Sequence, residues 1–188
     1  MLTLGIDPGT AATGFGLVRQ CGDRLLQVGH GCILTSPAEA AHERLAKIYS
    51  GLKKLIDDYK PDMVAVERLY FGSNSKTALA VGQARGMVLL AAAERKIPIS
   101  EYTPLEVKIA ITGYGKAGKK QIQQMVKNLL NLSQFPKPDD AADALAVAIC
   151  HLHSYKMLNF RIEAGGPSLA HLRRDFTAGQ KNIHGARA

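Results

Sequence analysis

The chain has 188 residues, of which 46% are hydrophobic and 21% are charged, a balance typical of a globular protein with one sizeable core. This composition excludes wholesale disorder, and the chain has no apolar run of about 20 residues, the length that a membrane span needs. The first residues, MLTLGIDPG, lack a basic leader and reach an acid at position 7. We therefore expect no signal peptide, no membrane contact and a cytoplasmic location.

Hydrophobic periodicity predicts ten secondary-structure elements before residue 156. Apolar, β-prone runs predict five strands, at 2–8, 13–20, about 24–34, 63–66 and 97–102. Apolar residues at three- and four-residue spacing predict five helices, one from Ser36-Pro37 to Tyr59 and others at about 76–96, 104–112, 119–132 and 139–155. Three meandering strands, then two strands that each follow a helix, indicate an α/β fold with one mixed five-stranded sheet flanked by helices on both sides.

The periodic pattern ends at about Lys156. We therefore predict one domain over residues 1–155 and a basic, flexible C-terminal extension over residues 156–188. The basic residues of this extension outnumber its acids, Glu163 and Asp175, and they are Lys156, Arg161, Arg173, Arg174, Lys181 and Arg187.

Positive charge is concentrated in one part of the chain. Lys and Arg number 24 against 16 Asp and Glu, which gives a net charge of +8. Between Glu106 and Asp139 there is no acid, whereas this stretch contains Lys108, Lys116, Lys119, Lys120, Lys127 and Lys137. A stretch of one sign favours a surface that faces a polyanion such as nucleic acid, although a solvated helix face would have the same pattern.

Cysteine and histidine show no pattern of a metal site or a nucleophile. Cys21, Cys32 and Cys150 form no CxxC pair, so we expect reduced, buried side chains. His151 and His153 are two residues apart and diverge on a helix, which favours structural or exposed roles over zinc binding. The chain also lacks a Ser-His-Asp signature and a GxxxxGK phosphate loop, so we expect no nucleotide cofactor.

Acidic residues stand at the ends of two predicted strands. Asp7 ends the first strand and Glu67 the fourth, and the expected strand order makes these strands neighbours with both acids at one edge. Asp140 and Asp143 share one helix face, but so would Asp139 and Asp143. An aspartate at 139 or 140 could instead be a helix N-cap, and Asp7 could be only a turn former. Crowded carboxylates with oxygen ligands alone favour Mg²⁺ or Mn²⁺ over zinc.

Four segments carry a family resemblance: GIDPGTAATGFGLV, VAVERLYFGSNSKTALAVGQARG, EYTPLEVKIAITGYGKAGKKQIQQMV and PDDAADALAVAICH. In this order, over about residues 2–155, they resemble the RuvC family of bacterial Holliday-junction resolvases, which have an RNase H-like fold. The resemblance implies that the catalytic, metal-binding carboxylates are Asp7, Glu67, Asp140 and Asp143, because the family's D-A-A-D pattern selects Asp140 over Asp139.

The resemblance also implies DNA-binding residues. Tyr70, where many members have Phe, would stack against unpaired bases at the crossover, and Lys108 and Lys119 would contact phosphates. We add Lys116 and Lys120 as DNA-binding candidates because they belong to the same lysine stretch.

The implied activity is that of a homodimeric, structure-selective endodeoxyribonuclease that resolves four-way DNA junctions by symmetric nicking in recombination and repair. The implied partner is the RuvA–RuvB branch-migration complex. Hydrolysis would use Mg²⁺, with Mn²⁺ able to substitute and two ions in each site, and would leave a 5′-phosphate and a 3′-hydroxyl.

Three other functions stay open at the level of the sequence. A nuclease of the same fold that acts on RNA–DNA hybrids would share the carboxylates. A sugar-kinase or actin-type protein also has an Asp-x-Gly hairpin, as in Asp7-Pro8-Gly9, but needs two such domains. A junction-binding protein without activity would not need the acids. Cleavage of a synthetic four-way junction in Mg²⁺, together with a test of ATP binding, separates these functions.

Overall fold

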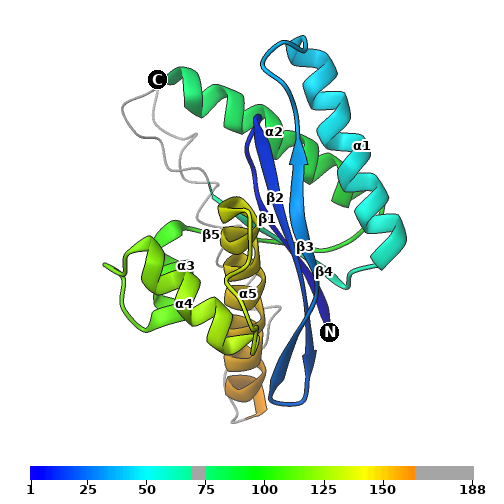
Figure 1. Cartoon of the computed structure of the whole chain (residues 1–188). Coiled ribbons are helices and arrows are strands. Elements are labelled where there is room, and N and C mark those ends of the chain that lie inside the picture. The colour runs from blue at the N-terminus through cyan, green and yellow to red at the C-terminus, as the bar shows by residue number, and fades with distance from the viewer. Residues whose placement is uncertain (69–74, 164–188) are drawn as a thin grey trace, which may run out of the picture. The chain divides into compact units, whose positions relative to one another are not determined.

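The computed structural model describes residues 1–68 and 75–163, and its centre is a five-stranded sheet in the order β3-β2-β1-β4-β5 (Figure 1). The strands are β1 (Leu2–Asp7), β2 (Ala12–Cys21), β3 (Arg24–Leu34), β4 (Met63–Glu67) and β5 (Ile99–Tyr102). The first three strands pair antiparallel, whereas β4 pairs parallel to β1 and β5 parallel to β4. The sheet is therefore mixed, as predicted, and β1 is its middle strand.

Helices cover both faces of the sheet (Figure 1). The described residues form α1 (Ala41–Tyr59), α2 (Ser75–Glu94), α3 (Pro104–Thr112), α4 (Lys119–Leu129) and α5 (Asp139–Glu163). On one face, α1 and α2 bury residues such as Ile48 and Val88 against Leu4 of β1. On the other face, α3, α4 and α5 pack together around residues such as Val126 and Ile149. Strands that are buried on both faces, as β1 and β4 are here, are typical of a sheet between two helical layers.

Two glycines let α5 lie directly on the sheet. A Cβ atom at Gly5 of β1 would come within 2.2 Å of the carbonyl oxygen of Ala144, and one at Gly16 of β2 within 2.7 Å of the backbone nitrogen of Leu145. Both distances are far below van der Waals contact, so any larger residue at these positions would push the helix away. The glycines thus determine how closely the start of α5 approaches β1.

Two helix boundaries differ from the prediction by more than three residues. α1 begins at Ala41 rather than at Ser36-Pro37, because Ser36 forms a local turn. Its hydroxyl accepts a hydrogen bond from the N–H of Ala38 at 3.2 Å, and its own N–H donates to the carboxylate of Glu39 at 2.8 Å. Such local hydrogen bonds compete with helix formation. α5 in turn continues to Glu163, beyond the predicted end at residue 155.

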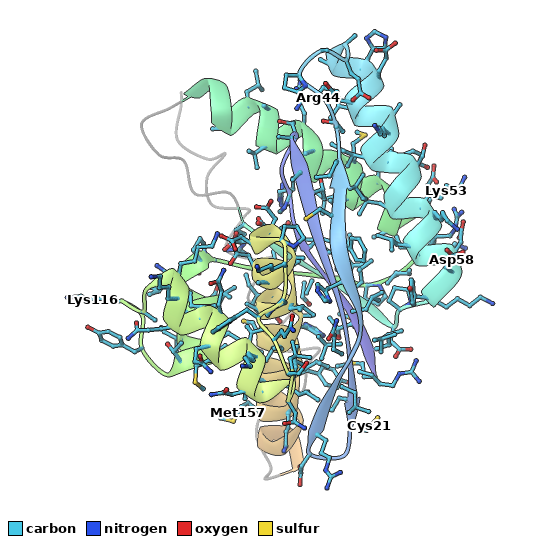
Figure 2. All side chains as sticks on the ribbon, in the orientation of Figure 1. Cys21, Arg44, Lys53, Asp58, Lys116 and Met157 are labelled. Carbon is cyan, nitrogen blue, oxygen red and sulfur yellow. The ribbon has the colours of Figure 1, made fainter. Side chains whose placement is uncertain are left out.

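The cysteines and His151 differ in their surroundings. The expectation of three buried thiols is right only for Cys150, since Cys32 is half-buried and Cys21 is exposed beside the β2–β3 turn (Figure 2). His151 of α5 is buried and forms a hydrogen bond of 2.9 Å between its Nδ1 and the hydroxyl of Tyr102. Burial lowers the pKa of His151 to about 4, so the ring is neutral and links α5 to β5.

Residues Met1–Leu152 form one compact unit, which contains the whole sheet, and His153–Ala188 form a second. The basic extension predicted for residues 156–188 falls largely outside the described residues and stays a prediction. Within the described ranges, no helix combines the length and the apolar character that crossing a membrane requires.

Candidate active site

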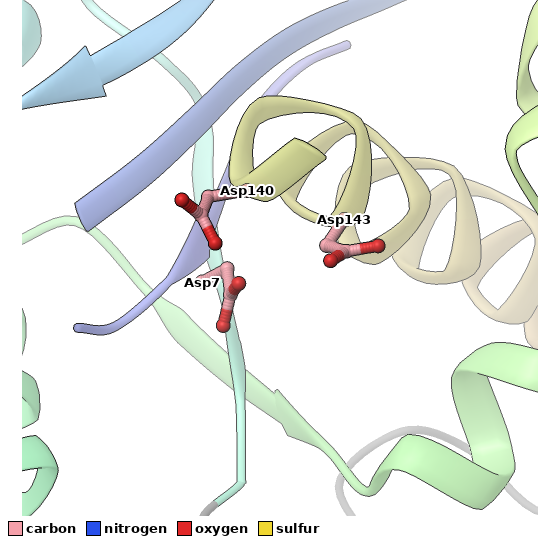
Figure 3. A group of neighbouring side chains, drawn as sticks. All are labelled: Asp7, Asp140 and Asp143. Carbon is pink, nitrogen blue, oxygen red and sulfur yellow. The ribbon is translucent and has the colours of Figure 1, made fainter. Parts of the chain in front are cut away.

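Asp7, Asp140 and Asp143 converge where the first turns of α5 cross the end of β1 (Figure 3). Each contributes a carboxylate oxygen, and these oxygens all lie within 4.8 Å of one another. All three residues are partly buried, so water screens their charges only in part. Three carboxylates at this spacing form a donor set of the kind that binds Mg²⁺ or Mn²⁺.

Parallel strand pairing brings Glu67 beside Asp7. Ile6 of β1 is in register with Val66 of β4, so the next residue of each strand lies at the same edge of the sheet. The carboxyl groups of Asp7 and Glu67 therefore lie close enough for each to affect the pKa of the other.

Burial and mutual repulsion raise the pKa values of Asp7, Glu67 and Asp143. Desolvation is the largest cause for Asp7, and the negative charges of Glu67 and then of Asp143 and Asp140 raise its pKa further, from 3.8 to about 7. Desolvation, followed by the charge of Asp143, also raises the pKa of Glu67. For Asp143, desolvation outweighs the opposing attraction of Lys119, so its pKa is raised as well. The site therefore holds more negative charge than its surroundings neutralise, which fits a cation site.

Two lysines and two of the acids line a common cavity of about 220 Å³. Its lining residues are Glu67, Pro104, Val107, Lys108, Lys119, Ile122, Asp143 and Ala146. The Nζ atom of Lys119 lies 3.2 Å from Oδ2 of Asp143. The positive charge of Lys108 lowers the pKa of Glu67, against the larger effect of burial. A phosphate in this cavity would thus lie between two ammonium groups and beside the carboxylates.

Asp139 faces α4 and lies outside the group of three converging aspartates. Its Oδ2 atom is 3.3 Å from Nζ of Lys119, and its Oδ1 atom accepts a hydrogen bond of 3.0 Å from Nε2 of Gln123. The three clustered oxygens belong to Asp7, Asp140 and Asp143. Spacing along the helix does not distinguish Asp139 from Asp140, but the rotation of α5 about its own axis does.

The other predicted DNA-binding residues lie away from the cavity or outside the described residues. Lys116 lies on the loop before α4 and extends away from the sheet (Figure 2), and Lys120 lies in the first turn of α4. Both are exposed, and neither lines the cavity. Tyr70 lies outside the described residues, so its predicted role stays a prediction.

Sequence reasoning missed the part that Gly14 plays in the site. Gly14 of β2 pairs with Asp7 and lies beneath the start of α5. A Cβ atom there would come within 2.1 Å of the carbonyl oxygen of Asp140. The only sign in the sequence is the alternation of glycines in Thr13–Gly16, which is equally typical of an ordinary strand or turn.

Gly14→Ala is expected to displace the start of α5 and to weaken Mn²⁺ binding strongly. Overpacking of this kind costs about 1–3 kcal/mol of unfolding free energy. Urea unfolding and calorimetric Mn²⁺ titration measure the two effects. Gly29→Ala is the matched control, because its Cβ would lie 3.6 Å from the hydroxyl of Tyr59, an ordinary contact. If Gly14→Ala binds Mn²⁺ like the wild type, the close packing at Gly14 is not needed for the site.

Comparisons with known proteins show the family of this chain. The family model described as Crossover junction endodeoxyribonuclease RuvC matches residues 3–151. A protein of that name from Desulforamulus reducens is 58% identical over 151 residues, which cover 80% of this chain and 93% of that protein. Another, from Syntrophomonas wolfei, is 54% identical over 160 residues, which cover 85% of this chain and 93% of that protein.

Solved structures show the same similarity. The Thermus thermophilus RuvC structure has a TM-score of 0.78 at 36% identity, and a structure of T. thermophilus RuvC in complex with Holliday junction substrate has 0.77 at 34%. Each comparison covers 84% of this chain and 96% of the other. The yeast mitochondrial resolvase Ydc2 has a TM-score of 0.62 at 16% identity, which shows a shared fold. The predicted RNase H-like arrangement is thus confirmed, and the chain belongs to the RuvC family of crossover junction endodeoxyribonucleases.

Proposed function

We propose that this chain is a structure-selective endodeoxyribonuclease that resolves four-way DNA junctions by symmetric nicking in recombination and repair. The observation that carries the proposal is the convergence of acids from β1, β4 and α5 beside a cavity that Lys108 and Lys119 line. The names of the relatives, and the solved complex of T. thermophilus RuvC with Holliday junction substrate, support the choice of substrate.

We propose Asp7, Glu67, Asp140 and Asp143 as the catalytic ligands of two Mg²⁺ ions, with Mn²⁺ able to substitute. The donor set fits, because it contains only carboxylate oxygens and the pKa values of Asp7, Glu67 and Asp143 are raised in the direction that a bound cation would reverse. When bound, such ions activate the attacking water and shield the leaving 3′-oxygen. The expected products are a 5′-phosphate and a 3′-hydroxyl.

The lysines are proposed to bind the DNA backbone. Lys108 and Lys119 would hold phosphates at the cavity, whereas the exposed Lys116 and Lys120 would contact phosphates further along a duplex arm of the junction. Each neutralised phosphate releases counterions, so the affinity for DNA should fall steeply as the salt concentration rises. Tyr70 is proposed to stack on a base at the junction centre, where bases unstack most readily, a contact worth about 1–3 kcal/mol. Its support is the family resemblance of the segment around it.

We further propose a cytoplasmic homodimer that acts with the RuvA–RuvB complex. Two nicks placed symmetrically on one junction need two sites related by a two-fold axis, which a dimer provides. The support for the partner is the family itself. Residues 1–155 would form the nuclease domain, and residues 156–188 a basic, flexible extension.

Cleavage of a synthetic four-way junction tests this function. In Mg²⁺ we expect paired nicks with ligatable ends, and in EDTA no cleavage. A linear duplex of the same sequence and an RNA–DNA hybrid are the controls. Equal cleavage of the linear duplex would contradict structure selectivity, and preferred cleavage of the hybrid would assign the carboxylates to the related RNase activity.

A further inference from the structure

Glu101 holds two arginines at the same edge of the sheet as the acids, but on the opposite face. It belongs to β5 and is in register with Val66 of β4, whose side chain packs in the core beneath α1 and α2. The Glu101 carboxylate forms an ion pair with the guanidinium of Arg85 on α2, and its other oxygen lies 3.7 Å from Nε of Arg68. The Glu101 carboxylate thus contacts both Arg68, which directly follows Glu67, and α2, the next helix in the chain.

The backbone adds a second link at the same place. The N–H of Arg68 donates a hydrogen bond of 2.7 Å to the carbonyl oxygen of Tyr102, the residue after Glu101. The pairing of β4 with β5 therefore extends one residue past Glu67. Glu67 itself is in register with Tyr102, so it lies between Val66, which is fully buried, and Arg68, which is held by main chain and side chain.

The ion pairs around Glu101 are shielded from solvent more than most surface pairs. Side-chain exposure is 27% for Glu101, 26% for Arg85 and 40% for Arg68. Charges at this depth attract one another more strongly than fully solvated charges do. Removal of one partner therefore leaves the charges of the others without a nearby opposite charge. The arrangement is therefore suited to hold a strand end in place.

We propose that Glu101 is a positioning residue for the candidate active site. By holding Arg68 and Arg85, it keeps the end of β4 in place and with it the direction of the Glu67 carboxylate toward Asp7. Ligand atoms of a metal site must be held within a fraction of an ångström, which requires support from residues behind the ligands. This inference rests on the proposed function in one respect, namely that Glu67 is a metal ligand.

Glu101→Gln tests the proposal with three measurements. The Mg²⁺ concentration for half-maximal junction cleavage is expected to rise about tenfold, and calorimetric Mn²⁺ affinity without DNA to fall by a similar factor. Junction affinity in EDTA is expected not to weaken, because Glu101 is on the face away from the cavity and its loss removes a negative charge. A general structural defect would weaken junction binding as well, so these measurements separate positioning from misfolding.

Two further variants complete the test. Arg68→Gln removes the contact nearer to Glu67 while Glu101 keeps Arg85, and it is expected to raise the Mg²⁺ requirement too. A double variant with both Glu101→Gln and Arg68→Gln should then need little more Mg²⁺ than Glu101→Gln alone, since both changes break the Arg68–Glu101 ion pair. Asp57→Asn is the matched control. It breaks the ion pair between Asp57 of α1 and Arg95, the residue directly after α2, whose Nε lies 2.7 Å from Oδ1 of Asp57, and it should leave the Mg²⁺ requirement unchanged.

The proposal is overturned if Glu101→Gln folds and has the metal affinity and Mg²⁺ requirement of the wild type. If Glu101→Gln does not unfold cooperatively, Arg68→Gln decides, and a wild-type Mg²⁺ requirement in that variant overturns it. Failure of the proposed function has a different signature, because in that case the wild-type protein itself would not cleave junctions in Mg²⁺.

Discussion

Asp7→Asn is expected to reduce junction cleavage by about three orders of magnitude or more while junction binding persists. Asp7 is on the middle strand of the sheet and interacts with acids from both β4 and α5, so every other proposed ligand is a neighbour of its carboxylate. An amide of the same shape removes the negative charge and one oxygen donor but keeps the packing. The lysines that would hold the phosphates are unchanged.

Single-turnover cleavage in saturating Mg²⁺ and junction binding in Ca²⁺ or EDTA measure the two effects. Asp58→Asn is the matched control, since it makes the same chemical change on an exposed turn of α1, where Asp58 pairs with Lys54 at 2.8 Å (Figure 2). The control should cleave like the wild type. Normal turnover by Asp7→Asn in Mg²⁺ would remove Asp7 from the catalytic site.

Without divalent cations, the folded protein is expected to lose stability as the pH rises from about 4 to about 8. The pKa of Asp7 is 3.8 for the free group and about 7 in the folded protein. The folded state therefore binds a proton more tightly, and the resulting stabilisation is fully present below pH 3.8 and lost as the pH rises through about 7. The raised pKa values of Glu67 and Asp143 act in the same direction. The loss should be on the order of 2 kcal/mol, since nearby lysines and water screen part of the repulsion.

Urea unfolding at several pH values in EDTA measures this loss, and Asp7→Asn is the comparison. The free energy of unfolding of the variant should fall less steeply with pH. The variant should also be more stable than the wild type at pH 8, although we expect it to be inactive. The pKa of Glu39 is lowered by the hydrogen bond from the N–H of Ser36 and by Lys47, and the pKa of Asp57 is lowered by Arg95. Both groups contribute in the opposite direction, but equally in both proteins. Mg²⁺ should restore wild-type stability at high pH, because it binds the folded state. Identical pH slopes in the two proteins would contradict the repulsion at Asp7.

Much of the fold could be predicted because short sequence patterns determine most of its strands and helices. The five strands follow from short apolar runs, and the two strands reached through helices indicate parallel pairing. This alone suggests that Asp7 and Glu67 share an edge, and the register of Ile6 with Val66 confirms that their strands are neighbours. The prediction was wrong where side chains compete with the backbone, as at Ser36, whose hydrogen bonds delay the start of α1.

The details of the site could not be predicted from local patterns. Asp139 and Asp140 are equivalent by spacing, and the contact of Gly14 with the start of α5 is part of what directs one toward Asp7 and the other toward Lys119. The arginines held by Glu101 come from segments remote in the chain, and no motif predicts their meeting.

The sequence by itself determined the kinds of chemical group available: carboxylates at strand ends and on a late helix, and a stretch of lysines without acids. Only the tertiary structure decided which of these groups meet and which protonation states they favour. The reason is that desolvation and charge repulsion depend on burial and on distances of a few ångströms between atoms far apart in the chain. The raised pKa of Asp7 results from its burial and from the charges of Glu67 on β4 and of Asp143 and Asp140 on α5, a combination that no single segment contains.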